Sequence, residues 1–152
     1  ASMMTAHVLV PAWNADHPST LDPKALGILR RQYGYQGLII SDDLEMAAIA
    51  ERYGMAEAVT LGVEAGVDLF LVCRRRDRVE EAYETLVKLA ESGPLARKIA
   101  AASRRVEATI KRYVGSPAAP SLAGAQAVLR KTRFDLADDR TAGVDPTEFD
   151  RT

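Results

Sequence analysis

The 152-residue chain has little of what small disulfide-rich domains, membrane proteins and nucleic-acid binders depend on. Its single cysteine, Cys73, excludes an internal disulfide framework and a cysteine-based zinc site. No apolar run approaches the roughly 20 residues that span a bilayer. No basic start followed by an apolar segment marks a signal peptide. With 20 basic and 21 acidic residues, the charge pattern gives no reason to expect nucleic acid or an anionic membrane as a partner.

What the chain does have is a 47% hydrophobic composition, enough for one globular domain with a core. Apolar runs that are typical of buried strands alternate with amphipathic segments, an order that predicts an α/β fold with parallel strands and crossover helices. The strands are predicted at residues 3–10, 37–43 and 67–73, and the helices at residues 22–34, 44–54, 55–66, 74–93 and 95–115.

Three strands make a small parallel sheet with open edges, and a complete (β/α)8 barrel needs about 250 residues. The chain also opens within a strand-like pattern, so we expect residues 1–115 to be the C-terminal part of a larger barrel. From residue 116 to 152 the composition shifts to Ala, Pro, Ser and scattered charges. This segment is predicted to be a tail with a helical turn near residues 125–131.

The most informative stretch is GLIISDDLEM, residues 37–46, in which a buried strand ends directly on Asp42 and Asp43. In α/β folds, ligands bind at the carboxyl ends of the strands. The two acids are therefore candidate reactive groups. The spacing of Asp42 and Glu45 also fits a capping box for a following helix, and from spacing alone capping is the more frequent role.

Three segments resemble, in order, the C-terminal portion of glycoside hydrolase family 3: MTAHV (Met4–Val8), the Leu29-Arg30 pair ahead of YGYQGLIISDDLEM (Tyr33–Met46), and GVEAGVDLFLVC (Gly62–Cys73). The similarity is strongest to the bacterial β-N-acetylglucosaminidases, or β-hexosaminidases, of peptidoglycan recycling. The DPTEF segment, Asp145–Phe149, is also similar to the terminus of some members.

The resemblance implies a (β/α) barrel in which Asp42 is the nucleophile of a retaining mechanism. Because the nucleophile role matches one position only, Asp43 is expected to be a supporting residue that forms hydrogen bonds or caps the next helix. It implies a carbohydrate substrate, an N-acetylglucosamine-containing muropeptide, with no cofactor and no metal, and a cytoplasmic location. The family takes its acid/base from a His in an upstream KHFPGHG-like loop, which nothing in this chain matches. The chain is therefore expected to be truncated and, alone, inactive or nearly so.

Several other residues carry open alternatives. His7 is either a hydrogen-bonded core residue or a substrate-binding residue, and Met46 either lines the pocket or packs in a helical core. Trp13 fits a sugar-stacking platform less well than a residue packed on the rim. His17 is expected to be exposed. Together with its neighbour Asp16 it does not predict a zinc site, because such a site needs three or four ligands.

At the end of the third predicted strand, Cys73 is expected to be a small buried residue. Arg74, Arg75 and Arg76 follow it as a solvated charge run, or as a site where one arginine reaches a carboxylate of a cell-wall fragment.

Two other classes of protein remain to be weighed. The paired acids resemble the Mg²⁺-binding pocket of a phosphoacceptor receiver domain, but a receiver also needs a Lys on a later strand, where this chain has Cys73-Arg74. The second alternative is a non-catalytic half-barrel that serves as a binding or assembly module.

Overall fold

The structure, a computed structural model, describes residues 2–14, 16–91, 93–115 and 121–131. The chain divides after Gly115 into two units. In the second unit the described element is helix α6, Leu122–Lys131, which includes the predicted turn and begins three residues before it. The DPTEF segment lies outside the described residues.

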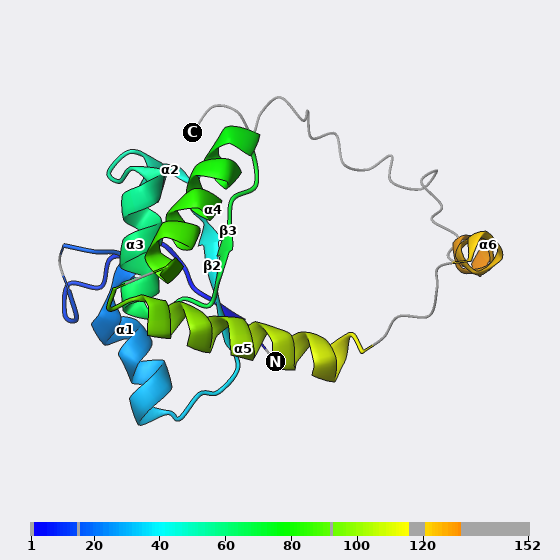
Figure 1. The fold of residues 1–152 in the computed structure, drawn as a ribbon, viewed down its shortest axis with the longest axis horizontal. Coiled ribbons are helices and arrows are strands. Elements are labelled where there is room, and N and C mark those ends of the chain that lie inside the picture. Colours follow the sequence, from blue (N-terminus) through cyan, green and yellow to red (C-terminus); the bar gives the residue numbers. More distant parts are fainter. Residues whose placement is uncertain (1, 15, 92, 116–120, 132–152) are drawn as a thin grey trace, which may run out of the picture. The chain divides into compact units, whose positions relative to one another are not determined.

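The first unit contains three strands and the helices that connect them (Figure 1). The strands are β1 (Ser2–Met4), β2 (Leu38–Asp43) and β3 (Leu69–Leu71). The longer helices are α1 (Pro23–Gly27), α3 (Met55–Ala65), α4 (Arg76–Glu91) and α5 (Ala96–Tyr113). The short elements are a 3-10 turn η1 (Ser19–Leu21), a π-helical turn η2 (Ile28–Gln32) and α2 (Ala47–Ala50). Among the described residues no helix is long and apolar enough to cross a bilayer.

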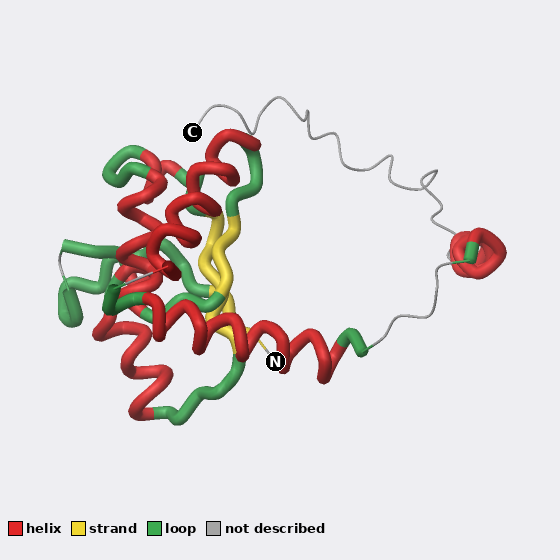
Figure 2. The backbone as a smooth tube through the Cα atoms, viewed as in Figure 1, coloured by secondary structure: helices red, strands yellow, loops and turns green. Residues whose placement is uncertain are grey.

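The three strands form one sheet (Figure 2), and they are parallel, as predicted. Their order across the sheet is β1-β2-β3. Met4 lies opposite Ile40 on one side, and Leu69 lies opposite Ile40 on the other. The pairing of β2 with β3 is irregular between Ile40 and Asp43. The middle strand is therefore the one whose carboxyl end is flanked by both neighbours.

The outer strands are shorter than predicted, because other groups take over their hydrogen bonds. After Thr5, whose N–H still donates to Ile40, the chain leaves β2, and the carbonyls of Ala6 and Val8 accept instead from Ser19. On the other side, the Leu71 N–H donates to the hydroxyl of Ser41 at 2.9 Å rather than to a strand carbonyl. The predicted strands at residues 3–10 and 67–73 were therefore wrong in length, although right in position and direction.

Local signals predicted some helix boundaries but not others: the predicted helix at residues 44–54 was wrong in length, since α2 has only four residues and a turn precedes it. The start of α1 and the end of α3 were predicted correctly. Asp22 is the N-cap of α1, where its carboxylate accepts from the N–H groups of Lys24 and Ala25, and Pro23 takes the first helical position. Helix α3 ends at Gly66, whose φ of 107° is open to glycine at low cost.

Helices α1, α3 and α4 lie on one side of the sheet (Figure 1) and enclose the apolar core. The core contains Leu21, Leu44 and Val59 in one cluster, and Leu26 and Ile39 in the other. Burying each such side chain contributes about 1.5–3 kcal/mol.

In the sequence of α4, Val79, Tyr83, Leu86 and Leu89 recur at three- and four-residue steps, which predicts that these residues form one apolar side of the helix. This prediction was only half right. Val79 and Tyr83 are 45% and 67% exposed, and the helix instead buries Ala82, with Leu86 packed partly against the core. The three- and four-residue spacing identified the helix, but the position of α3 decides which side of it is covered.

A buried carboxylate, Asp68, joins four segments at the amino ends of β2 and β3. Its side chain is fully buried and forms ion pairs with Arg30 of η2 and Arg105 of α5. It also accepts the Ile39 N–H at 2.9 Å. Arg30 donates further to the carbonyls of Tyr35 and Gly37, ahead of β2. Because all these donors converge on one anion, Asp68 fixes how β2, β3 and α5 meet.

We expect Asp68→Asn to lower the free energy of unfolding by about 3 kcal/mol, because it leaves two guanidinium groups without their counter-charge. Urea denaturation with an unchanged m-value would measure the loss. Glu80→Gln is the matched control, because the Arg76–Glu80 pair is exposed and should change stability by less than about 1 kcal/mol. Equal effects of the two substitutions would contradict the role of Asp68.

Candidate active site

The candidate site lies at the carboxyl end of β2, where both aspartates still belong to the strand. Burial alternates in the middle of this strand: Ile39 and Ser41 are fully buried, whereas Ile40 and Asp42 are partly exposed. The side chain of Asp42 is therefore on the open face of the sheet. One of its oxygens, Oδ1, accepts the N–H of Asp43 at 2.8 Å.

The capping alternative for Asp42 is wrong. Helix α2 begins at Ala47 with Met46 as its N-cap, and no side chain caps it. Asp43 instead organises the turn that leaves the strand: its Oδ1 accepts the Glu45 N–H at 3.1 Å, and its carbonyl accepts the Met46 N–H at 3.1 Å. The expectation that Asp43 is a hydrogen-bonding residue is confirmed.

His7 comes to the site from the loop after β1, not from within a buried strand as expected. Its Nε2 lies 3.0 Å from the carbonyl oxygen of Asp43, and its Nδ1 lies 3.0 Å from the Thr20 hydroxyl. Both ring nitrogens are thus engaged within the protein. A direct hydrogen bond from His7 to a substrate would have to replace one of these contacts.

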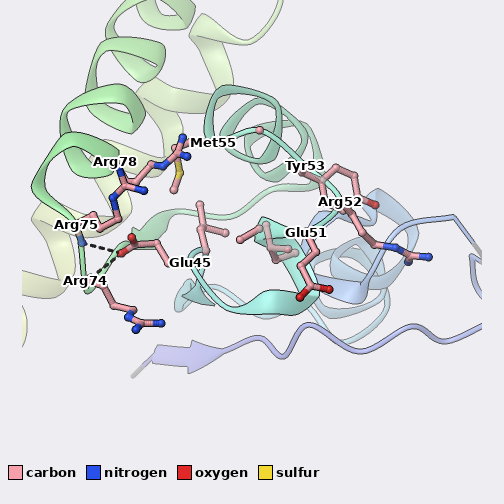
Figure 3. Close-up of a pocket in the computed structure, with 12 residues that line it drawn as sticks. Glu45, Glu51, Arg52, Tyr53, Met55, Arg74, Arg75 and Arg78 are labelled. Atoms are coloured by element: carbon pink, nitrogen blue, oxygen red, sulfur yellow. Dashed lines mark hydrogen bonds between the residues drawn. The ribbon is translucent and has the colours of Figure 1, made fainter. Parts of the chain in front are cut away.

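Glu45, which the sequence analysis considered only as part of a capping box, joins the turn after β2 to the end of β3. Its Oε2 accepts the backbone N–H groups of Arg74 and Arg75 at 2.6 and 3.2 Å (Figure 3). The N–H of Cys73 donates to Oδ1 of Asp43 at 3.2 Å. The sequence signal for these links was weak: acidic residues stand at the end of one predicted strand, and residues 73–75 stand at the end of the next.

Cys73 is exposed, which corrects the expectation of a buried thiol. Partial desolvation, and then the carboxylates of Asp43, Glu45 and Asp42, raise the pKa of its thiol above the ordinary value. The backbone N–H of Cys73, which donates to Asp43, places this residue beside the acidic cluster.

The remaining candidates are Met46, Trp13 and His17. Met46 is 46% exposed and Trp13 is 43% exposed, so neither is packed in the core. His17 is partly buried rather than exposed, because its Nδ1 lies 3.1 Å from the hydroxyl of Tyr53, which donates to the carbonyl of Asp16. Within the described part of the chain, no three His, Cys, Asp or Glu side chains are grouped so that they could hold a metal ion.

A cavity of about 700 Å³ adjoins the turn after β2 (Figure 3). Its charged lining residues are Glu45, Glu51, Arg52, Arg74, Arg75 and Arg78. Arg75 and Arg78 are paired with Asp77 and Glu81. Arg76 pairs with Glu80. Of the three consecutive arginines, Arg74 is thus the one whose guanidinium takes part in none of the ion pairs formed by the described residues.

The pKa of the single thiol gives a direct test of this geometry. Iodoacetamide reacts with the thiolate, so the alkylation rate of Cys73 should reach half its maximum at a higher pH than that of a cysteine in an unstructured peptide. Asp43→Asn removes a negative charge, lowers the pKa and should move this midpoint toward lower pH. Glu80→Gln, on α4 and outside the acidic cluster, should leave it in place. A midpoint unaffected by Asp43→Asn would contradict the contact between thiol and carboxylate.

Comparison with known proteins places this geometry in a family. Residues 1–109 match the model of the glycosyl hydrolase family 3 N terminal domain. A protein named beta-hexosaminidase from Neisseria meningitidis is 31% identical over 144 residues, which are 95% of this chain and 36% of that protein. One of the same name from Thiobacillus denitrificans is 34% identical over 99% of this chain and 38% of its own length.

Solved structures agree with the sequence comparison. The glycoside hydrolase family 3 beta-N-acetylglucosaminidase from Paenibacillus sp. is 38% identical with a TM-score of 0.71, over 80% of this chain and 24% of its own. The beta-N-acetylglucosaminidase from Thermotoga maritima is 34% identical with a TM-score of 0.69, over 84% and 28%. The chain thus spans between a quarter and two fifths of these relatives. By its sequence and its fold, the chain belongs to glycosyl hydrolase family 3.

Proposed function

We propose that the chain is the nucleophile-bearing part of a retaining β-N-acetylhexosaminidase, with Asp42 as the nucleophile. The observation that carries the proposal is the position of Asp42: a partly exposed carboxylate on the open face of the middle strand, at its carboxyl end. The names of the relatives, beta-hexosaminidase and beta-N-acetylglucosaminidase, support N-acetylglucosamine as the sugar.

In this mechanism a carboxylate oxygen of Asp42 attacks the anomeric carbon while the bond from that carbon to the aglycone oxygen breaks. The departing oxygen takes a proton from a general acid, and water then cleaves the glycosyl–Asp42 ester and returns the carboxylate. Oδ1 of Asp42 is held by the Asp43 N–H, which leaves Oδ2 as the attacking atom. The general acid belongs, in this proposal, to a part of the enzyme outside these 152 residues.

The barrel follows from the same reasoning. A (β/α)8 barrel repeats one strand followed by one helix, with the helices outside and the other face of the sheet lining the interior. Three consecutive parallel strands with helices on one face fit that repeat. Asp42 would then point into the mouth of the barrel, where the catalytic groups of such enzymes gather.

The resemblance to the peptidoglycan-recycling branch also supports a cytoplasmic location, which cell fractionation would test.

A covalent trap tests the nucleophile. The protein that carries this chain, treated with a 2-fluoro sugar that forms a slow-to-hydrolyse ester, should gain one sugar mass on the peptide containing Asp42. Asp42→Asn should abolish this label and lower kcat by at least about 10³-fold. Asp16→Asn, in an exposed loop, is the control and should keep both. A label on a different carboxylate would reject Asp42.

We propose a muropeptide as the specific substrate, and its recognition would require a site that binds its carboxylates. Arg74 is the arginine best placed for this, because it lines the cavity beside Glu45 and its guanidinium takes part in no ion pair among the described residues. Met46, on the turn after Asp42, is the residue we propose to contact the sugar from the same side.

Arg74→Ala should raise KM for a muropeptide about 10-fold, the loss of one charge-assisted hydrogen bond, and leave KM for a neutral chromogenic N-acetylglucosaminide unchanged. Steady-state kinetics on the two substrates measure this. Arg76→Ala is the matched control, because Arg76 is held by Glu80 on the exposed surface of α4. Parallel changes on both substrates would argue against an anion site at Arg74.

The non-catalytic half-barrel remains a second candidate, favoured by the exposure of Met3 and Met4 on β1, at 41% and 58%. It predicts that Asp42 is never labelled by the trap. The receiver-domain alternative loses its support, because the family match covers the acidic strand end itself.

A further inference from the structure

Asp43 is the point at which the carboxyl ends of all three strands are joined. Its carbonyl receives a hydrogen bond from His7, which follows β1, and its carboxylate receives one from the N–H of Cys73, which follows β3. Its own N–H donates to Asp42. The carbonyl and the carboxylate of Asp43 thus contact the segments that follow β1 and β3, and its N–H contacts the proposed nucleophile, the preceding residue of β2.

The tautomer of His7 follows from this arrangement. A carbonyl oxygen can only accept, so Nε2 of His7 must carry a proton and donate it to Asp43. Nδ1 then faces the hydroxyl of Thr20, which is fully buried and lies 2.8 Å from the hydroxyl of Thr5. The ring is thus fixed on both sides, by η1 and by the end of β2.

We infer that His7 and Asp43 are positioning residues, which form a clamp that holds the carboxylate of Asp42 in its attacking orientation; this inference rests on the proposed function. His7 fixes the carbonyl side of Asp43, and the Cys73 N–H fixes its side chain. With both ends held, the Asp43 N–H stays aimed at Oδ1 of Asp42. The clamp consists of His7, Asp43 and the backbone N–H of Cys73.

The clamp is needed because the backbone ladder is weak here. β1 and β3 have three residues each. The paired residues of β1 reach only Ile40 of β2, and the pairing of β3 with β2 becomes irregular between Ile40 and Asp43. Without the clamp, the last residues of β2 would be held by few backbone hydrogen bonds. A displacement of about 1 Å at a reacting group can lower a rate about 10²-fold, so side-chain hydrogen bonds at this position act on kcat rather than on binding.

The decisive experiment measures how fast Asp42 is labelled by the 2-fluoro sugar in the protein that carries this chain. His7→Ala should lower the labelling rate constant and kcat about 10²-fold with KM within about twofold. His7→Gln, whose side-chain amide can donate to the same carbonyl, should restore at least a tenth of the wild-type rate. Equal rates for His7→Ala and wild type, or no rescue by His7→Gln, would overturn the clamp.

Two measurements separate positioning from loss of folding. Asp68→Asn destabilises the opposite ends of the same strands, so it should lower stability while keeping the labelling rate of the folded molecules. Hydrogen exchange provides a readout without any substrate: the Asp43 amide should be protected in the wild type and lose at least about 10-fold of its protection in His7→Ala, but not in His7→Gln.

The tautomer provides the third readout. The ¹⁵N shifts of His7 should show the proton on Nε2, and a proton on Nδ1 alone would refute the clamp whatever the activity. If Asp42 is never labelled but the tautomer and the protected amide are found, the proposed nucleophile fails while the clamp geometry stands. If labelling occurs without them, the nucleophile stands and the clamp fails.

Discussion

The arrangement of the strands depends on one buried carboxylate. The side chain of Asp68 is fully buried, and an unpaired anion in that position would cost far more free energy than the fold could offset. Two arginines and the Ile39 N–H compensate for it, and each comes from a different segment. The Asp68 N–H donates to the Ile39 carbonyl, and the Asp68 carboxylate accepts the Ile39 N–H. These two hydrogen bonds together set the register in which β3 meets β2.

A register set at one end leaves the other end to be held separately. The β2–β3 ladder becomes irregular after Ile40, and the hydroxyl of Ser41 and the carboxylate of Asp43 accept the N–H groups that the backbone would otherwise pair. This is a reason for polar residues at a buried strand end that has nothing to do with chemistry. Because Ser41 and Asp43 accept these N–H groups, the side chain of Asp42 is not used to join β2 to β3 and lies on the open face. Neighbouring residues thus serve the strand pairing and the proposed chemistry separately.

Local patterns made part of this fold predictable. The direction of β2, the start of α1 at Asp22-Pro23 and the end of α3 at Gly66 depend on residues within a few positions of one another, and all three were predicted. The lengths of the outer strands were not, because they depend on hydrogen bonds to η1 and to side chains of β2. The ion pairs of Asp68 join residues that lie 38 and 37 positions apart, and no periodicity reports such a contact.

The pair Asp42-Asp43 shows most clearly what a motif leaves open. Two identical side chains, side by side in sequence, have the same intrinsic acidity and the same capping propensity. Strand alternation places the first toward the open face, and the turn after β2 captures the second through its carboxylate and carbonyl. Among the described residues, Asp43 is held at four contacts, two N–H groups on its Oδ1 and the His7 ring and the Met46 N–H on its carbonyl. The carboxylate of Asp42 is held at one, the Asp43 N–H on its Oδ1. The difference in role thus comes from position along one strand, and it is why the nucleophile of this family member is proposed to be the first acid.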